Sequence, residues 1–275
     1  MTPVPFAYRR ATSVQEAISL LTEHGEEAKA IAGGHSLLPI MKLRFAAPEL
    51  LVDLGGIPDL DHIRVEGDEM VLGALARHSD LELSALLREE VPLLAHTAGL
   101  VGDCQIRHRG TLGGSVAHGD PSADLPATLV ALRATVVVDG PGGRRTVPVD
   151  HFYTGFLETA LAPDELVVEL RVPRTGDAPW GYQKFRRRGI DWAIVGVAYQ
   201  SEPGAGGIGL VNMGPTTLRA AAAEEALRAG ADPAQVAALA DQDTAPVGDA
   251  SGSPEYRRHL ARVLLSRALA GRNSS

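Results

Sequence analysis

The sequence has a single cysteine, Cys104, among its 275 residues. One thiol cannot form an internal disulfide, and it cannot supply the several thiolates that an iron–sulfur cluster or a cysteine-rich zinc site needs. No two histidines have the spacing of a zinc motif such as His-Glu-x-x-His, so the sequence predicts no metal site. Any cluster that works with this chain must therefore lie on a partner. Cys104 is assigned no role, because a lone cysteine is usually a packing residue.

Positive charge and long apolar runs are also scarce. The chain has 26 basic against 34 acidic residues, a net charge of −8, so it lacks the broad basic field that holds nucleic acid or an anionic membrane. No apolar run approaches the roughly 18–20 residues that span a bilayer, and residues 1–10 lack the apolar core of a signal peptide. We therefore expect a cytoplasmic protein with no integral membrane segment and no nucleic-acid partner.

Two glycine pairs are the strongest chemical features that the sequence does contain. The first segment is Ala32-Gly33-Gly34-His35-Ser36. It lies between a short apolar run at residues 30–32, typical of a strand, and a helical pattern over residues 37–45. This order directs free backbone N–H groups and the positive end of a helix dipole at whatever occupies the turn. The first segment therefore favours binding of a diphosphate.

The second segment is Thr111-Leu112-Gly113-Gly114-Ser115. Its glycines permit positive φ angles and a close approach of the backbone to a ligand, and its hydroxyls can donate to phosphate. Asp124 follows at the start of an apolar helical pattern, and its carboxylate suits a ribityl or ribose hydroxyl. The alternative is a surface turn followed by an ordinary helix start. The presence of both segments in one chain favours two sides of one ligand.

Three stretches together resemble the FAD-binding medium subunits of molybdenum hydroxylases, the family of xanthine dehydrogenase and aerobic carbon monoxide dehydrogenase. They are residues 32–39 (Ala-Gly-Gly-His-Ser-Leu-Leu-Pro), 105–115 (Gln-Ile-Arg-His-Arg-Gly-Thr-Leu-Gly-Gly-Ser) and 120–126 (Asp-Pro-Ser-Ala-Asp-Leu-Pro). The resemblance is closest to the carbon monoxide dehydrogenase branch and runs nearly end to end. Ser115 departs from the asparagine that many relatives carry after the glycine pair.

The resemblance implies an FAD site. Both glycine segments would wrap the diphosphate, Asp124 would bind sugar hydroxyls, and Lys184 would reach the polar edge of the flavin. Val167 would make a backbone contact, and Trp192 would shield one flavin face. For Lys184 a solvated strand position, and for Trp192 a core position, remain alternatives. The full expected set is Ala32, Gly33, Gly34, His35, Ser36, Thr111, Leu112, Gly113, Gly114, Ser115, Asp124, Val167, Lys184 and Trp192.

The resemblance also implies a role. A large subunit with the molybdenum cofactor would oxidise the substrate, a small 2Fe-2S subunit would relay electrons, and this chain would pass them from FAD to an external acceptor. The expected assembly is a heterotrimer or a dimer of heterotrimers, and no side chain of this chain is expected to be catalytic. Two alternatives stay open: a self-contained flavin oxidase on the same fold, and a non-catalytic flavin-binding protein.

The predicted fold class is α+β. The resemblance implies a two-subdomain FAD-binding fold of the vanillyl-alcohol oxidase / p-cresol methylhydroxylase type, over residues 1–55 and 56–173. After a polar linker, residues 180–271 predict a C-terminal domain with a three-stranded antiparallel sheet followed by helices. Residues 204–209 match the dinucleotide-binding glycine pattern, but no strand precedes them and a strand pattern follows. We therefore predict a hairpin there and no nicotinamide domain.

Overall fold

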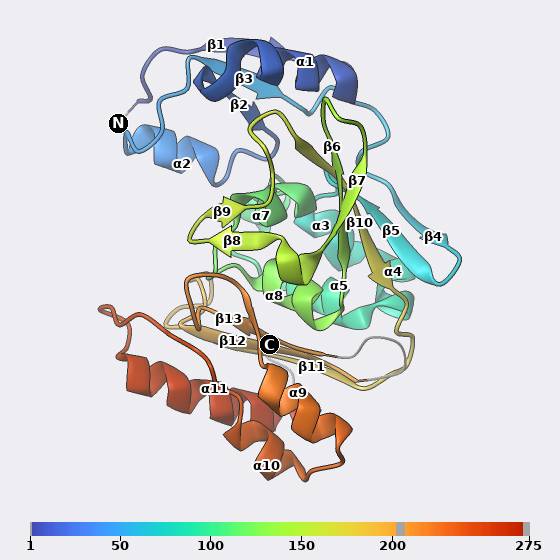
Figure 1. Cartoon of the computed structure of the whole chain (residues 1–275), viewed down its shortest axis with the longest axis vertical. Helices are drawn as coiled ribbons and strands as arrows, with labels where there is room; N and C mark the ends of the chain where they lie inside the picture. Colours follow the sequence, from blue (N-terminus) through green and yellow to red (C-terminus); the bar gives the residue numbers. More distant parts are fainter. Residues whose placement is uncertain (1, 202–206, 272–275) are drawn as a thin grey trace.

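The computed structural model describes residues 2–201 and 207–271. The chain forms an α+β structure in which three sheets are stacked from the N-terminal to the C-terminal end (Figure 1). Within the described residues, every helix is too short or too polar to cross a lipid bilayer. The three layers meet around one large cavity.

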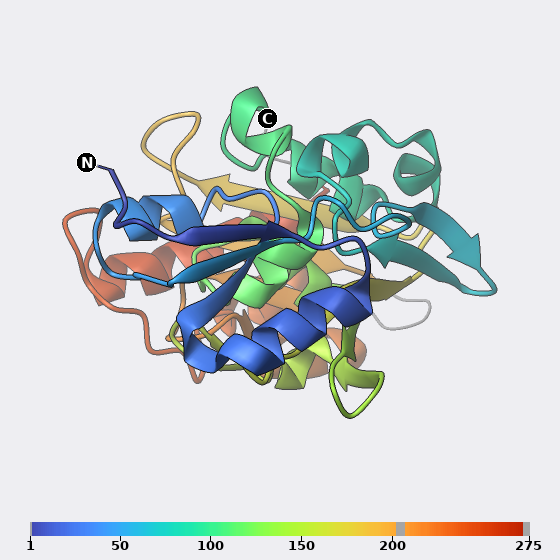
Figure 2. The same cartoon turned by 90° about the horizontal axis from the view of Figure 1, so that it is seen from above.

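The N-terminal layer is a parallel sheet in the order β1-β3-β2. Its elements are β1 (Ala7–Arg10), α1 (Val14–His24), the 3₁₀ turn η1 (Gly25–Glu27), β2 (Ala28–Ile31), α2 (Leu37–Lys42) and β3 (Leu50–Asp53). Ser13 caps α1 by accepting a hydrogen bond from the Glu16 backbone, as its capping-box spacing predicts. Helix α1 lies beside the strands (Figure 2) and buries its apolar face against them. Strand β1 was not expected, because all four of its residues are exposed and show no apolar alternation.

The middle layer is a five-stranded antiparallel sheet in the order β4-β5-β10-β6-β7, with helices packed on it. Its first half contains β4 (Ile63–Glu66), β5 (Glu69–Gly73), α3 (His78–Leu83), α4 (Ala85–Glu90), α5 (Pro92–Gly99) and α6 (Cys104–Arg107). Its second half contains α7 (Leu112–His118), α8 (Asp124–Ala131), β6 (Thr135–Asp139), β7 (Arg145–Pro148), η2 (Val149–His151), β8 (Tyr153–Gly155), β9 (Glu158–Thr159) and β10 (Leu166–Pro173). The sequence predicts strands over residues 61–66 and 70–75 joined by a turn at Gly67-Asp68. The β4–β5 hairpin turns at Gly67 with a φ of 60°, so this prediction is confirmed.

One helix start in this layer differs from the sequence expectation. The sequence Ser79-Asp80-Leu81-Glu82 has capping-box spacing and predicts a helix that begins after Ser79, but α3 begins at His78 and Ser79 lies inside it. The cap is Ser84 instead, whose Oγ accepts from the Leu87 backbone and starts α4. Both serines have spacing compatible with a cap, and only the path of the chain selects between them.

The C-terminal layer is an antiparallel sheet of four strands, in the order β11-β12-β13-β14, and not the three expected. Its elements are β11 (Trp180–Phe185), β12 (Val195–Gln200), β13 (Gly207–Val211), β14 (Leu218–Arg219), α9 (Ala221–Arg228), α10 (Pro233–Ala238) and α11 (Pro254–Leu269). The sequence predicts a helix over residues 218–229, but Leu218 and Arg219 pair with β13 and the helix starts only at Ala221. A two-residue strand has too little sequence pattern to be predicted.

The sheet of this layer lies between α8 on one side and α11 on the other (Figure 1). Gly209 permits this packing, because a Cβ there would lie 1.9 Å from the Ala127 carbonyl oxygen in α8. Residues 204–206 of the glycine-rich pattern lie outside the described residues. Residues 207–209 belong to β13, so a strand stands where a dinucleotide-binding fold needs a helix.

Candidate functional site

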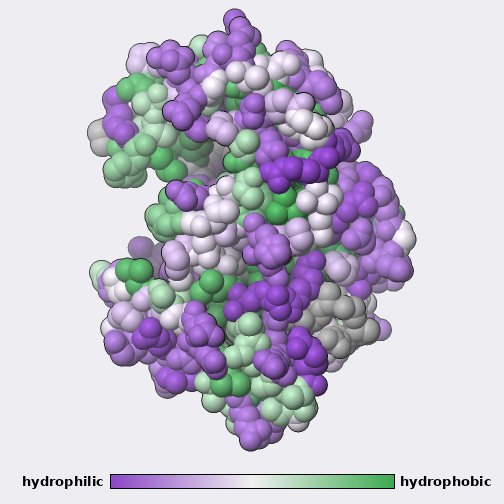
Figure 3. All heavy atoms as spheres, in the orientation of Figure 1, coloured by the Kyte–Doolittle hydropathy of each residue, from purple (hydrophilic) through white to green (hydrophobic). Residues whose placement is uncertain are grey.

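A cavity of about 790 Å³ lies where the three layers meet. In the space-filling view a notch opens between α2 and the β8–β9 hairpin, and apolar side chains gather at its edges (Figure 3). The walls come from the β2–α2 connection, α7, the β8–β9 hairpin, β10 and the segment that follows β11. Both glycine segments therefore border one cavity, although about 75 residues of sequence separate them.

The first glycine segment connects β2 to α2. Gly34 has a φ of 77°, which glycine adopts without strain. Ser36 stands at the N-cap of α2 but its side chain makes no capping hydrogen bond. In the described part of the chain, none of the backbone N–H groups of residues 33–36 donates a hydrogen bond to protein. These donors at a helix N-terminus must be satisfied by water or by a ligand, and an anion suits them best.

Gly33 brings the two segments together. A Cβ on this residue would lie 2.1 Å from the carbonyl oxygen of Arg109, far inside van der Waals contact. The absence of a side chain therefore lets the β2–α2 connection pack directly on the chain that enters α7. A larger residue would push the two walls of the cavity apart.

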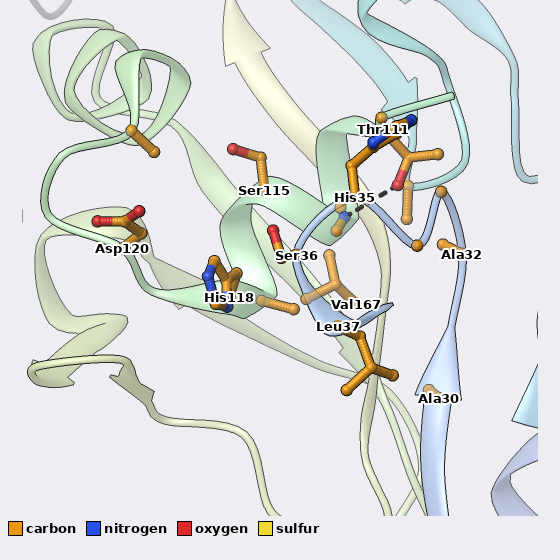
Figure 4. A pocket seen from close by; sticks show the side chains of 18 of the residues that line it. Ala30, Ala32, His35, Ser36, Leu37, Thr111, Ser115, His118, Asp120 and Val167 are labelled. Carbon is orange, nitrogen blue, oxygen red and sulfur yellow. Dashed lines mark hydrogen bonds between the residues drawn. The ribbon is translucent and has the colours of Figure 1, made fainter. Parts of the chain in front are cut away.

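The second segment is not a loop with positive φ, as was expected, but the first turn of helix α7. Its N–H groups already have partners: Leu112 and Gly113 donate to the carbonyls of Ala76 and Ala74 (2.9 and 2.8 Å). Gly114 donates to Thr111 Oγ1 (3.2 Å), the bond dashed in Figure 4. This turn therefore offers a ligand little backbone hydrogen bonding.

What the second segment offers is space and side-chain groups. A Cβ on Gly113 would lie 2.5 Å from the Ala74 side chain, whereas a Cβ on Gly114 would meet only Thr111 Oγ1 (2.7 Å). Ser115 borders the cavity near Ser36 and His118 (Figure 4). Leu112 does not line the cavity, because its side chain is fully buried in the core of the middle layer.

His78 lines the cavity behind the second segment and was missed in the sequence. Its Nε2 donates to the Thr111 carbonyl oxygen at 3.1 Å, so it holds the residue that caps α7. Burial lowers the pKa of His78 to about 4, and the ring is therefore neutral at pH 7. No sequence pattern distinguishes a histidine that supports a cavity wall from any other histidine after a strand, so sequence reasoning could not have found His78.

Asp124 and Lys184 form a buried ion pair at the wall between the middle and C-terminal layers. Lys184 Nζ lies 2.7 Å from Asp124 Oδ2 and 3.1 Å from the Leu100 carbonyl oxygen. The side chains of Asp124 and Lys184 are 5% and 1% exposed, so the alternative of a solvated lysine is wrong. Tyr182, which the sequence did not single out, donates to Asp124 Oδ1 at 2.5 Å. Strand alternation places Tyr182 and Lys184 on one face of β11. This spacing is the one sequence signal that could have predicted that both side chains contact Asp124.

Trp192 lies at the rim of the cavity and is 69% exposed, so the alternative of a core tryptophan is wrong. Ile190 is exposed beside it and also borders the cavity. Val167 lines the cavity from β10 (Figure 4).

Among residues 2–201 and 207–271, no group of three or more His, Cys, Asp or Glu side chains is placed to hold a metal ion. The Cys104 thiol is exposed.

Comparisons with known proteins agree along the whole chain. Residues 4–175 match the family "FAD binding domain in molybdopterin dehydrogenase", and residues 180–271 match the "CO dehydrogenase flavoprotein C-terminal domain". The chain is 42% identical to the carbon monoxide dehydrogenase medium chain of Hydrogenophaga pseudoflava, over 98% of this chain and 97% of that one. It is 36% identical to the 6-hydroxypseudooxynicotine dehydrogenase complex subunit alpha of Paenarthrobacter nicotinovorans, over 98% and 95%.

The structural similarity is equally extensive. A solved structure of carbon monoxide dehydrogenase from Hydrogenophaga pseudoflava superposes with a TM-score of 0.94 at 43% identity, and the match covers 98% of each chain. The glycine segments, the cavity between the layers and the end-to-end matches lead to one conclusion. The chain belongs to the family of FAD-binding medium subunits of molybdenum hydroxylases, and it is the flavoprotein subunit of such an oxidoreductase.

Proposed function

We propose that this chain binds one FAD in the cavity and transfers electrons from an iron–sulfur partner subunit to an external acceptor. The observation that carries the proposal is the set of unpaired N–H groups at residues 33–36, which border a cavity of about 790 Å³ in a chain of this family. We assign the N-terminal and middle layers to a two-part FAD-binding fold of the vanillyl-alcohol oxidase type. Residues 180–271 would form the separate flavoprotein domain, with the boundaries expected from the sequence.

The first glycine segment fits the diphosphate. Its backbone donors lie at the N-terminus of α2, where the helix dipole stabilises negative charge, and residues 32–36 themselves contain no lysine or arginine. The chain has an overall charge of −8, so local dipoles, and not a broad basic field, would bind the negatively charged diphosphate. Across the cavity, Gly114 leaves room for the ligand and Ser115 adds a hydroxyl donor.

Asp124 fits the sugar chain. Tyr182 and Lys184 each occupy one lone pair of its two oxygens, which leaves acceptor capacity for hydroxyl groups in the cavity. Lys184 is held against Asp124 and Leu100, and it adds positive charge to this wall of the site. Trp192 at the rim would cover one face of the ring system. When bound, FAD supplies the two-electron chemistry that links single-electron carriers to an acceptor, and no base from this chain is required.

The proposed partners are a large subunit with the molybdenum cofactor and a small 2Fe-2S subunit. The single cysteine supports this, because a cluster needs several thiolates. Carbon monoxide is the substrate that we propose for the complex, on the strength of the 42% identity to a carbon monoxide dehydrogenase medium chain. A subunit of a dehydrogenase named for 6-hydroxypseudooxynicotine is nearly as similar, which is expected if substrate never contacts this chain.

The test is rapid mixing of the flavin-loaded chain with carbon monoxide, followed at the flavin absorbance. We expect the isolated chain to keep its flavin oxidised, and addition of the molybdenum and iron–sulfur partners to bleach it. Bleaching by the isolated chain would instead support a self-contained oxidase. Failure of the chain to bind any FAD would refute the proposal as a whole.

A further inference from the structure

The junction between the two family domains contains a buried polar cluster, which consists of Asp124, Tyr182 and Lys184. Asp124 opens α8, inside the segment that matches the FAD-binding domain, whereas Tyr182 and Lys184 lie on β11, inside the C-terminal domain. Asp124 also borders the cavity. The cluster therefore joins a cavity residue of one domain to two donors of the other.

Tyr182 brings a hydroxyl group into the interior of the protein. Its side chain is 0% exposed, and its hydroxyl donates to Asp124 Oδ1 at 2.5 Å. Gly196 on the neighbouring strand makes room for it, since a Cβ at that position would lie 3.3 Å from the hydroxyl. A phenylalanine would fill the same space and avoid burying a polar group, so the hydroxyl serves the carboxylate.

The two donors fix the carboxylate from opposite ends. Lys184 Nζ holds Oδ2 at 2.7 Å and Tyr182 holds Oδ1, which leaves the Asp124 side chain a single orientation. Burial of a carboxylate costs free energy unless it is paired and hydrogen-bonded, and the two donors provide this compensation. Lys184 pairs its positive charge with the carboxylate, and Tyr182 orients the carboxylate through a hydrogen bond without adding another charge.

We propose that Tyr182 is a positioning residue for the cofactor: by holding Asp124 Oδ1, it presents the carboxylate of the FAD-binding domain to the sugar hydroxyls of FAD. The inference rests on the proposed function of the cavity. It also makes the FAD site depend on the C-terminal domain, because that domain contributes both donors. The sheet of this domain packs against α8, whose first residue is Asp124.

The test compares Tyr182→Phe with the wild-type full-length chain in titrations with FAD, followed by flavin fluorescence. Loss of one hydrogen bond to a charged group should weaken FAD binding about ten- to a hundredfold. The matched control is Tyr199→Phe on β12, which removes a hydroxyl from another buried tyrosine of the same sheet, outside the cavity lining. The control should change the dissociation constant by less than about twofold.

A double-mutant cycle separates positioning from general damage to the fold. In an Asp124→Ala background, Tyr182→Phe should change FAD affinity by less than about threefold, because the acceptor of its hydroxyl is already gone. If Tyr182→Phe has its full effect in both backgrounds, the hydroxyl does not act through Asp124 and the inference is wrong. Should Asp124→Ala fail to fold, the comparison of the FAD affinities of Tyr182→Phe and Tyr199→Phe still tests the inference.

The two proposals fail in different ways. A wild-type chain that binds no FAD would overturn the proposed function. A wild-type chain that binds FAD, with a Tyr182→Phe variant of equal affinity, would overturn only the positioning role.

Discussion

Gly33 and Gly114 border the same cavity, but we predict that substitutions at the two positions fail for different reasons. A Cβ on Gly114 would meet only the Thr111 hydroxyl, at 2.7 Å, and would otherwise extend into the cavity. Loss of the Thr111 cap costs about 1 kcal/mol, and replacing a helical glycine by alanine returns about the same amount. Gly114→Ala should therefore fold with nearly unchanged stability, and Gly114→Val should do so with a small loss.

Gly33, in contrast, has no space for a side chain. Its Cβ would lie 2.1 Å from the Arg109 carbonyl oxygen and 2.8 Å from the carbonyl carbon, which are backbone atoms that cannot rotate away. Relief requires movement of the β2–α2 connection or of the chain before α7, at a cost of roughly 1–3 kcal/mol or more. Gly33→Ala should therefore lower the free energy of unfolding, and it should also lower FAD affinity because the two walls separate.

The assay combines urea unfolding of the flavin-free chain with titration by FAD. Gly114→Val should keep a free energy of unfolding within about 1 kcal/mol of wild type and yet bind little FAD, because its side chain occupies the cofactor's space. Gly142→Ala is the control, since nothing lies within 4 Å of a Cβ at that position and its φ is not positive. The reasoning is refuted if Gly114→Val retains full FAD affinity, or if Gly33→Ala is as stable as Gly142→Ala.

Two further predictions concern buried groups. Burial lowers the pKa of His78 from 6.5 to about 4, so the unfolded chain binds a proton that the folded chain does not. The contribution of His78 to the free energy of unfolding is fully present above pH 6.5, and roughly 3 kcal/mol of it is lost as the pH drops to about 4. In urea unfolding measured across this pH range, His78→Gln should lose this part of the pH dependence. A variant whose free energy of unfolding depends on pH as the wild type's does would contradict the assignment. The Tyr153 hydroxyl is buried and has no hydrogen-bond partner among the described residues. Tyr153→Phe should therefore raise the free energy of unfolding by about 1 kcal/mol, whereas a clear loss would reveal a partner for the hydroxyl.

The elements that the sequence predicted well are those with local causes. Ser13 caps α1 through an amide three residues away, and the β4–β5 hairpin turns at Gly67, which takes a positive φ. Both depend on neighbours within a few residues, so the sequence contains the whole explanation. The strand β3 (Leu50–Asp53) was likewise predicted at its observed bounds, because its apolar run is flanked by turn residues.

The elements that were predicted poorly have causes outside their own residues. The second glycine segment was expected to be a loop, but the carbonyls of Ala76 and Ala74 accept hydrogen bonds from the N–H groups of Leu112 and Gly113 and fix the segment as the start of α7. Strand β14 exists because β13 pairs with it, and its two residues carry no pattern of their own. The partners of α7 lie far earlier in the chain and β14 depends on the strand before it, so the propensity of either segment alone gives no information.

By itself, the sequence determined the chemistry of this protein: two glycine segments, an acidic residue at the start of a helix, a single cysteine and a net charge of −8, in an order that resembles one family. The tertiary structure decided which of those groups are free to act. It left the N–H groups of residues 33–36 unpaired at the cavity, satisfied those of α7 within the protein, and turned Lys184 toward Asp124 beside Tyr182. The physical reason is that residue type fixes what a group can donate or accept, whereas packing between distant segments fixes which partners it meets.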